Sequence, residues 1–283
     1  MYRVSIIAPV YNSAEFIEES IQSVLNQTYP KIEYIIMDAG STDGTVEIAQ
    51  RYADRLTIIS EPDNGQSDAI NKGWKRATGD VLTWLNGDDL YLPDTVENAV
   101  NYLTQHPDTM WLYGDAQFLY EDGTPGNFRY PILPWDYNKL LTFGCYISQP
   151  SVFLRREVIE RFGYLDESLH FGMDYEYWLR IGKIFPPAHV PDVKVKVKIF
   201  RDTKSRSGSY KRIQELEQML KRYGATTLPE LLRHQWVEAM LDKGDFKRLW
   251  RFPHYVPRGT AKWVLRKTLS AETEKRIRRW FVR

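Results

Sequence analysis

The sequence is poor in cysteine and in paired histidines. Cys145 is the only cysteine in 283 residues, which excludes an internal disulfide and a cysteine-rich metal site. The five histidines are scattered and form no His-x-x-x-His pair, so nothing supports a zinc-hydrolase interpretation. Without a disulfide framework, the expected compartment is the cytoplasm.

Long hydrophobic runs are also missing. No stretch of 18 apolar residues occurs, so a membrane-spanning helix is not expected. Because the first apolar run, Val4 to Ala8, starts almost at once, we expect no signal peptide. An apolar fraction of 43% and a charged fraction of 27% are typical of a globular protein. The length of 283 residues suits one large domain, or one domain with an appendage.

The net charge is unevenly distributed along the chain. Residues 243–283 contain 13 Lys and Arg but 3 Asp and Glu, a net charge of +10. The whole chain is +1, so residues 1–242 carry −9. An acidic body with a basic tail indicates a partner or a location rather than a fold.

Aromatic residues are interleaved with the basic residues of this tail, as in amphipathic helices that lie on membranes. We expect residues 243–283 to bind an anionic membrane surface, or an acidic partner there, at the inner face of the plasma membrane. The alternative is that the aromatic residues pack on the acidic body while the charges stay solvated. A nucleic-acid partner is not expected, because no known binding fold surrounds the basic residues.

The first 105 residues alternate between short buried strands and helices. Strands are predicted at residues 4–8, 34–37, 57–60 and 81–85. Four strands alternating with helices favour a doubly wound, mainly parallel α/β sheet. Right-handed crossovers then place the loops that follow the strands along one edge. We therefore expect four residues that follow strands to converge on one cleft: Tyr11, Asp38, Glu61 and Asp88.

Local signals bound the first predicted helix. Asn12, followed three residues later by Glu15, fits a capping box at its start. An apolar stripe that includes Ile17, Ile21 and Val24 has helical spacing. Pro30 should stop the helix.

The pattern becomes less regular beyond residue 105. Further strands are predicted at residues 110–113, 116–120, 149–155 and 193–198. Apolar residues up to Ile184 recur at helical spacing and predict a helix over residues 170–184. Polar residues 203–209 predict a mobile loop. The remainder is predicted to be helical over residues 210–223, 228–242, 259–269 and 271–282.

Two adjacent carboxylates, Asp88 and Asp89, follow the strand at 81–85 within four residues of its end. In an open α/β sheet, ligands bind outside the carboxyl ends of the strands. Carboxylate oxygens at that edge suit Mg²⁺ or Mn²⁺ held against a phosphate. The alternative is an ordinary turn, because Asn-Gly and Gly-Asp pairs are common in turns.

Six stretches, in this order, resemble glycosyltransferase family 2, whose members have the GT-A fold. They are SIIAPVYN at 5–12, DAGSTDGT at 38–45, EPDNGQSDAINKG at 61–73, NGDD at 86–89, QPSVFLRR at 149–156 and GMDYEYWLR at 172–180. The resemblance covers roughly residues 3–200. It implies a Rossmann-like, mixed and mainly parallel sheet flanked by helices. It also implies transfer of a sugar from a nucleotide-sugar to an acceptor, with inversion at the anomeric carbon.

The resemblance assigns the residues that bind the donor. Asp38 matches the aspartate that accepts a hydrogen bond from the nucleotide base, although it could instead cap the next turn. Pro9 and Tyr11 match positions that border the base and ribose, where Tyr11 offers a stacking face or is simply a structural aromatic. Asp68 and Lys72 lie on the segment that passes under the nucleotide.

Asn86-Gly87-Asp88 matches the Asp-x-Asp motif of the family, with an amide in place of the first acid. Asp88 is then the residue that binds the divalent cation, Mg²⁺ or Mn²⁺, between the two donor phosphates. Asn86 can hydrogen-bond a ribose hydroxyl but contributes no charge, so we expect weaker metal binding than in relatives with both acids. The cation stabilises the charge that develops on the nucleoside diphosphate as it leaves.

Asp174 matches the catalytic base of the family. An inverting displacement needs a carboxylate opposite the leaving group to take the proton of the acceptor hydroxyl. The alternative role is a helix N-cap, for which Asp is favoured. Glu176 is the second candidate for the base.

Several other positions keep two interpretations. Trp178 lines the sugar site or belongs to the core, and Gln149 matches a position that faces the acceptor in relatives. Lys204 and Arg206 fold over the diphosphate as a lid, or belong to a solvated loop.

We therefore expect a catalytic domain over residues 1–202, with a C-terminal helical appendage over residues 203–283. Its nucleotide-sugar half covers about residues 1–105 and its acceptor half about residues 106–202. The expected donor is a UDP-sugar, because uridine is the commonest base of the family. The expected acceptor is a glycan or lipid-linked molecule in cell-surface polysaccharide, lipopolysaccharide or glycolipid synthesis.

Two rival functions stay open. One is a catalytically inactive protein of the same fold that binds sugar nucleotides or acts as a scaffold, which Asn86 keeps possible. The other is a nucleotidyltransferase, which would normally carry a phosphate loop rich in glycine and basic residues after its first strand. The sequence PVYNSAEF at residues 9–16 is not such a loop.

Overall fold

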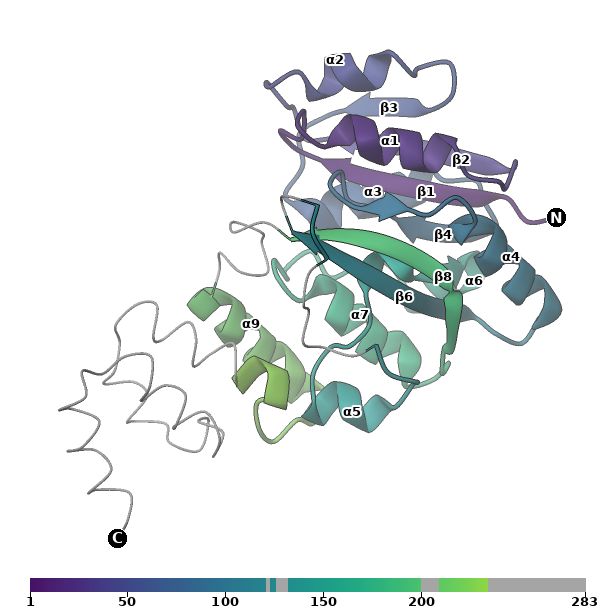
Figure 1. The fold of residues 1–283 in the computed structure, drawn as a ribbon. Coiled ribbons are helices and arrows are strands. Elements are labelled where there is room, and N and C mark those ends of the chain that lie inside the picture. The colour runs from purple at the N-terminus through teal and green to yellow at the C-terminus, as the bar shows by residue number, and fades with distance from the viewer. Residues whose placement is uncertain (121–122, 126–131, 200–208, 234–283) are drawn as a thin grey trace, which may run out of the picture. The chain divides into compact units, whose positions relative to one another are not determined.

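The computed structural model describes residues 1–120, 123–125, 132–199 and 209–233. The chain divides into two compact units, one made of residues 1–137 and 146–203 and the other of residues 138–145 and 204–283. The first unit contains an eight-stranded sheet with helices packed on it (Figure 1). The domain boundary expected at residues 202–203 stays a prediction.

The sheet is mixed and mainly parallel, as predicted. Its strands are β1 (Val4–Val10), β2 (Ile32–Asp38), β3 (Thr57–Ser60), β4 (Val81–Trp84), β5 (Leu90–Tyr91), β6 (Trp111–Tyr120), β7 (Phe153–Arg155) and β8 (Ala188–Ile199). Their order is β3-β2-β1-β4-β7-β6-β8-β5. The first four are parallel neighbours, and β6 is parallel to β8. β7 is antiparallel to β4 and β6, and β5 is antiparallel to β8.

The helices follow the strands in the alternation that the sequence predicts. They are α1 (Ile17–Leu25), α2 (Thr45–Gln50), α3 (Gln66–Arg76), α4 (Thr95–Gln105), α5 (Tyr137–Thr142), α6 (Arg156–Phe162), α7 (Met173–Gly182) and α9 (Ser209–Arg222), with a 3-10 turn η1 at Gln149–Ser151. Residues 230–233 are also helical, within the helix predicted at 228–242. The helices predicted at 259–269 and 271–282 lie outside the described residues, as does nearly all of the loop predicted at 203–209. The described ranges contain no helix that is both long enough and apolar enough to cross a bilayer.

Helices cover both faces of the parallel strands. On one face, Ile6 and Ala8 of β1 share a buried cluster with Ile21 of α1. On the other face, Ile7 lies so close to α3 that a Cβ on Gly73 would come within 2.4 Å of its Cγ2. Successive residues of β1 are therefore buried on opposite sides, which is the doubly wound arrangement.

A row of tryptophans forms the core between the sheet, α3 and α7. Trp84 of β4 meets Trp74 of α3 edge-on, with 5.5 Å between ring centroids, and stacks on Trp178 of α7 at 5.7 Å. Trp178 stacks in turn on Trp111 of β6 at 5.3 Å. All four side chains are buried. Trp178 therefore belongs to the core and does not line a sugar site.

The predicted capping box at Asn12 is wrong. Helix α1 begins at Ile17, and Phe16 at its N-cap makes no side-chain capping bond. Asn12 instead has a left-handed backbone, with φ of 49°, and its Oδ1 accepts a hydrogen bond from the Thr42 N–H at 2.9 Å. A contact between two loops therefore replaces the local cap. The helix also ends at Leu25, before the proline that was expected to stop it.

The second half of the sheet differs from prediction at β6. Residues 111–120 form one strand with a register shift between Tyr113 and Asp115, not two short strands. The shift lies at Gly114, where a Cβ would come within 1.9 Å of the Val193 carbonyl oxygen. Only glycine allows β8 to approach so closely at the register shift.

Two further boundaries are corrected. The strand predicted at residues 149–155 begins only at Phe153, because Pro150 and its neighbours form the turn η1. The helix predicted at residues 170–184 is shorter, and Ile184 beyond its end is 51% exposed. Pro150 favours the tight turn η1 over an extended strand. For α7, helical spacing alone does not show where the helix ends.

Candidate active site

The loops after β1 and β2 are tied to each other. The Asn12 N–H donates to Ser41 Oγ at 2.8 Å, and Asp43 Oδ2 accepts from the Ala14 N–H at 2.9 Å. Hydrogen bonds from the Thr45 hydroxyl and from the Ala14 backbone hold the pKa of Asp43 below its ordinary value. The first two loops that were expected to converge therefore do so.

Asp38, the last residue of β2, is buried and caps the turn that follows. Its Oδ2 accepts from the Gly40 N–H at 3.0 Å and from the Ser60 hydroxyl at 2.6 Å. The Ser41 N–H approaches both carboxylate oxygens, at 3.2 Å and 3.3 Å. Oδ1 carries only the longest of these bonds, so it is the oxygen with room for a further donor. The capping alternative is therefore present, and the role toward a nucleotide base stays a prediction.

Two residues beside Asp38 differ in exposure. Pro9 is half-buried within β1, whereas the Tyr11 side chain just beyond the strand is 63% exposed. An aromatic face that is open to solvent at a strand end can stack on a planar ligand. The geometry is therefore compatible with the predicted place of Tyr11 beside a base.

Asp68 and Lys72 of α3 pair with each other. Lys72 Nζ lies 3.0 Å from Asp68 Oδ2 and donates to the Pro62 carbonyl at 2.8 Å. The same Asp68 oxygen accepts from the Asn64 N–H at 2.9 Å. Burial alone would raise the pKa of Asp68, but the Asn64 bond and the Lys72 ammonium hold it below its ordinary value. Both side chains therefore support the loop before α3, and their predicted contact with a nucleotide stays untested.

Residues 86–89, directly after β4, form a tight turn that is closed twice. The Asp89 N–H donates to the Asn86 carbonyl at 3.1 Å, and Asn86 Nδ2 donates to Asp89 Oδ2 at 2.9 Å. Gly87 fits closely, since a Cβ there would lie 3.2 Å from Val10 Cγ1. Asp88, the third residue of the turn, is half-buried.

The protein does not fully compensate the charges of Asp88 and Asp89. Burial raises the pKa of Asp88. Burial, and then the charge of Asp88, raise the pKa of Asp89, which is 3% exposed. Lys198 of β8 opposes both shifts with its ammonium and bonds Asp89 through its backbone, but this ammonium also pairs with Glu19. A pair of carboxylates in this state favours a nearby cation.

The donor set fits a divalent cation that shares its ligands with a substrate. Within the described ranges, no group of three or more His, Cys, Asp and Glu could hold an ion by itself. Mg²⁺ is typically bound through one or two carboxylates plus substrate phosphates, and Mn²⁺ takes similar oxygen ligands. Asp88, with Asp89 beside it, supplies that number of carboxylates.

Two glutamines hold the Asn86 side chain. Its Oδ1 accepts from Gln66 Nε2 at 2.7 Å, and its Nδ2 lies 3.3 Å from Gln149 Oε1. Gln149 also donates from Nε2 to the Trp84 carbonyl at 2.8 Å. Gln149, which the sequence places near an acceptor, therefore contacts the residue that replaces the first acid of the motif.

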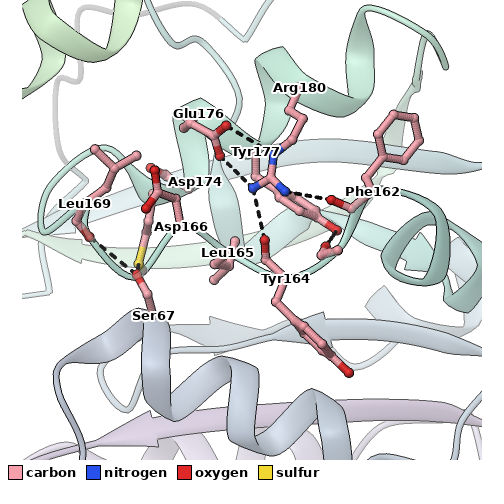
Figure 2. Close-up of polar contacts among 12 residues, drawn as sticks. Ser67, Phe162, Tyr164, Leu165, Asp166, Leu169, Asp174, Glu176, Tyr177 and Arg180 are labelled. Carbon is pink, nitrogen blue, oxygen red and sulfur yellow. Dashed lines mark hydrogen bonds and ion pairs between the residues drawn. The ribbon is translucent and has the colours of Figure 1, made fainter.

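The N-terminus of α3 joins this turn to the start of α7. Gln66 contacts Asn86, and the next residue, Ser67, lies 2.8 Å from Met173 Sδ and 3.4 Å from the Leu169 carbonyl (Figure 2). Met173 directly precedes Asp174. The turn that carries Asp88 and the helix that carries Asp174 therefore meet across two consecutive residues of α3.

Asp174 is the second residue of α7 and is half-buried. Its Oδ1 accepts from the Tyr175 N–H at 2.8 Å. The N-cap position belongs to Gly172, so the N-cap interpretation of Asp174 is wrong. It lies in the first turn of the helix, where an acidic side chain is favoured by the helix dipole.

Glu176, the second candidate base, is committed to an ion pair. Its two oxygens lie 2.8 Å and 3.1 Å from the Arg180 guanidinium, and the side chain is buried (Figure 2). Arg180 also donates to the carbonyls of Phe162 and Tyr164 at 2.8 Å and 3.0 Å. Arg180 therefore ties α7 to the end of α6, and Glu176 is its ion-pair partner within α7. The roles of Asp174 and Glu176 as catalytic base stay predictions.

Three residues at this edge were not singled out from the sequence: Gln66, Ser60 and Lys198. Each contacts a candidate residue that is 20 or more positions away or that belongs to another strand. Gln66 lies within the stretch EPDNGQSDAINKG, which is the only signal that could have drawn attention to it. Lys204 and Arg206, the possible lid residues, lie outside the described residues.

Residues 5–160 match the family model of glycosyl transferase family 2. The chain belongs to this family. An uncharacterised glycosyltransferase of Rickettsia typhi is 30% identical over 226 residues, which are 76% of this chain and 69% of that protein. A putative teichuronic acid biosynthesis glycosyltransferase of Bacillus subtilis is 35% identical over 126 residues, which are 43% of this chain and 50% of that protein. The chain therefore matches only part of each relative.

Solved glycosyltransferases share the fold. A mannosyltransferase of Pyrobaculum calidifontis, in complex with GDP-Man and Mn²⁺, has a TM-score of 0.64 at 22% identity, with 99% of this chain and 80% of that chain covered. Residues 1–349 of TarS from S. aureus, in complex with UDP-GlcNAc, have a TM-score of 0.63 at 18% identity, with 93% and 79% covered. The family 2 protein therefore has the expected GT-A type fold.

Proposed function

We propose that this family 2 protein is an inverting, metal-dependent glycosyltransferase whose donor is a nucleoside diphosphate sugar. The observation that carries the proposal is the meeting of the 86–89 turn and the start of α7 at Gln66 and Ser67. We infer that Asp88 and Asp174 thereby border one site. Asp88 would then serve a cation on the diphosphate, and Asp174 would serve an acceptor hydroxyl.

On the donor side, Asp88 would hold Mg²⁺ or Mn²⁺ with Asp89 behind it. A bound divalent cation would stabilise the negative charge of the leaving nucleoside diphosphate. Tyr11 and Pro9 would border the base, and Asp38 would accept a base N–H on Oδ1. Only Oδ1 of Asp38 has room for a further hydrogen bond, which supports a UDP-sugar as the donor. Uracil presents one ring N–H, whereas guanine presents a ring N–H and an adjacent amino group. Asn86 would face the ribose with the second lone pair of Oδ1, because its other polar groups bond Gln66, Gln149 and Asp89.

On the acceptor side, Asp174 would take the proton of the acceptor hydroxyl. The hydroxyl oxygen forms a bond to the anomeric carbon as the bond from that carbon to the diphosphate breaks on the opposite face, which inverts the configuration. General-base assistance of this kind contributes about 10²–10⁴ in rate. The alternative base, Glu176, would first have to leave Arg180.

The test uses purified full-length protein with a panel of UDP- and GDP-sugars. We expect Mn²⁺-dependent stabilisation by one donor, and release of its nucleoside diphosphate that EDTA abolishes. At one hundred times Kd the stabilisation is about 2.7 kcal/mol, which is easily measured as a rise in Tm. Donor binding without any release, with or without acceptors, would favour the inactive binding protein. Transfer of a nucleotide rather than a sugar would identify a nucleotidyltransferase.

The acceptor that we propose is a growing cell-surface glycan or its lipid-linked precursor. The name of the Bacillus subtilis relative, which refers to teichuronic acid biosynthesis, supports a polymer of this kind. A lipid-linked acceptor also gives the basic tail at 243–283 a use, since the cytoplasmic enzyme would meet it at the membrane. The tail lies outside the described residues.

Flotation with liposomes tests this location. Full-length protein should float with anionic vesicles at low salt, stay behind with neutral vesicles, and be released by salt. If the protein does not float with anionic vesicles even at low salt, the membrane proposal is wrong. The alternative, in which the aromatic residues of the tail pack on the acidic body, would then be favoured.

A further inference from the structure

We propose that Gln66, Asn86 and Gln149 form an amide relay that fixes the 86–89 turn and so positions Asp88 for the cation. The relay requires an amide at position 86, where the motif of the family has an acid. The three residues come from α3, the turn after β4, and η1. This inference rests on the proposed metal-dependent function and adds to it three positioning residues.

The direction of every hydrogen bond in the relay is set at one end. The Trp84 carbonyl can only accept, so Gln149 must direct Nε2 to it, at 2.8 Å. Gln149 Oε1 then faces Asn86, which must present Nδ2, at 3.3 Å. Asn86 Oδ1 therefore faces Gln66, which donates from Nε2 at 2.7 Å. The amide orientations follow from chemistry along the whole chain of contacts.

The relay ends on the turn that carries Asp88. The second hydrogen of Asn86 Nδ2 bonds Asp89 Oδ2 at 2.9 Å, beside the backbone bond that closes the same turn at 3.1 Å. Gly87 in the same turn is buried, and a Cβ there would lie 3.2 Å from Val10 Cγ1. The direction of the Asp88 carboxylate therefore depends on the Asn86 amide and, through it, on both glutamines.

A carboxylate at position 86 cannot replace this amide. It would offer no donor, and it would face Gln149 Oε1 on one side and the Asp89 carboxylate on the other. Both are acceptors, and the second carries a like charge when ionised. Asn86 is therefore a requirement of its neighbours and not simply a weakened metal ligand.

The first test is the pair of variants Gln149→Glu and Gln66→Glu. Each replaces one NH₂ group by oxygen with almost no change in shape, and each reverses or breaks the relay. We expect the Kd for Mn²⁺ in the presence of UDP, measured by calorimetry on fully folded protein, to rise about tenfold, as for lost second-layer partners of a metal site. Added negative charge alone would lower this Kd. A rise in Kd therefore indicates loss of the relay, and a fall indicates an effect of charge alone. Gln50→Glu, the same change at an exposed site on α2, is the matched control.

The second test exchanges the two ends of one hydrogen bond. Asn86→Asp should lower the Tm of the metal-free protein. The double variant Asn86→Asp/Asp89→Asn has the same net charge as the parent, and its amide at position 89 can donate to the carboxylate at position 86. It should recover at least part of the lost Tm.

Four outcomes decide the proposal. Glutamate variants that lose Tm but keep the Kd within about twofold would reduce the glutamines to a structural role and overturn it. An Asn86→Asp variant as stable as the parent would overturn it too, as would an exchange that recovers nothing. If the parent fails to bind Mn²⁺ both in the presence of UDP and in the presence of GDP, the proposed metal-dependent function is wrong. The role of the relay in positioning Asp88 for a cation is then wrong too. The exchange would then still show whether the relay exists.

Discussion

Carboxylates at the two ends of the same parallel strands have opposite environments. At the amino end, Glu33 of β2 accepts hydrogen bonds from the Ser5 hydroxyl and from both the N–H and the hydroxyl of Thr78, each of the latter at 2.7 Å. Arg3 lies 3.3 Å away. Burial alone would raise the pKa of Glu33, but these partners lower it. At the carboxyl end, the pKa values of Asp88 and Asp89 are raised.

The difference lies both in burial and in the supply of hydrogen-bond donors. Burial is the largest cause of the raised pKa values of Asp88 and Asp89, whereas hydrogen bonds and Arg3 outweigh it at Glu33. Glu33 has a donor for each oxygen within the protein, so its charge serves the fold. Asp88 and Asp89 have fewer hydrogen-bond donors around them than their charges need. Uncompensated charge of this kind is typical of a site that is completed by a ligand.

Asp38 is the intermediate case. It lies at the carboxyl end, yet it accepts hydrogen bonds from Gly40, Ser41 and Ser60. Position at the ligand edge of the sheet therefore does not by itself leave a carboxylate open.

The largest expected effect is that of removing Asp88. Asp88→Ala should reduce metal-dependent turnover by about 10³-fold, because the cation contributes several kcal/mol to charge stabilisation and each 1.4 kcal/mol is a factor of ten. The Tm of the metal-free protein should not fall, since the turn is closed by Asn86 and Asp89. Turnover is measured with and without Mn²⁺. Glu33→Gln, which removes a charge at the other end of the sheet, is the control. Equal losses of turnover in both variants would show that the two ends of the strands do not differ in function.

The next effect is that of Asp174. Asp174→Asn should reduce kcat by about 10²–10⁴ with little change in donor affinity, because the proton of the acceptor loses its base. Donor affinity is read by calorimetry, independently of turnover. Glu176→Gln is the matched control two residues away. It should lower Tm through loss of the Arg180 ion pair and leave kcat nearly unchanged, and the reverse pattern would exchange the roles of the two acids.

Glu33 should control stability in a pH-dependent way. Glu33→Gln is expected to cost about 1–3 kcal/mol of unfolding free energy at pH 7, as for a buried charged hydrogen-bond network that loses an acceptor. The folded-state pKa of Glu33 lies below its value in the unfolded chain. Its contribution is therefore present above the unfolded pKa and is lost as the pH falls through the folded pKa. Denaturant unfolding at pH 7 and pH 3 should show the two proteins converging at the lower pH, whereas a constant difference would contradict the assignment.

Much of the fold could be predicted, because it depends on local periodicity. The first four strands, their parallel arrangement and the helices between them follow from apolar runs separated by turn signals. Asp38 and Asp88 could be located for the same reason, since Asp38 ends a buried strand and Asp88 lies in the turn after another. Features that depend on one residue and its immediate neighbours are visible in the sequence.

The features that could not be predicted depend on contacts between distant residues. Gln149 and Asn86 are 63 positions apart, so nothing local shows that they hydrogen-bond. The close approach of Val193 to Gly114, at the register shift of β6, joins residues 79 positions apart. Asn12 has the local pattern of a helix cap, but a partner in the next loop takes its side chain.

The smallest effect tests the intermediate case, Asp38. Ser60→Ala removes the hydroxyl that donates to Asp38 Oδ2 at 2.6 Å, and should lower the free energy of unfolding by about 0.5–1.5 kcal/mol. Ser60→Thr keeps the hydroxyl and is the control. Donor affinity should stay within about twofold of the parent in both variants, because the base would use Oδ1 and the backbone of Gly40 and Ser41 still holds Oδ2. Unfolding is followed by denaturant titration and donor binding by calorimetry. A large loss of donor affinity in Ser60→Ala, absent in Ser60→Thr, would show that the hydroxyl orients Asp38 for the base, and Asp38 would then join Asp88 among the carboxylates that serve the ligand.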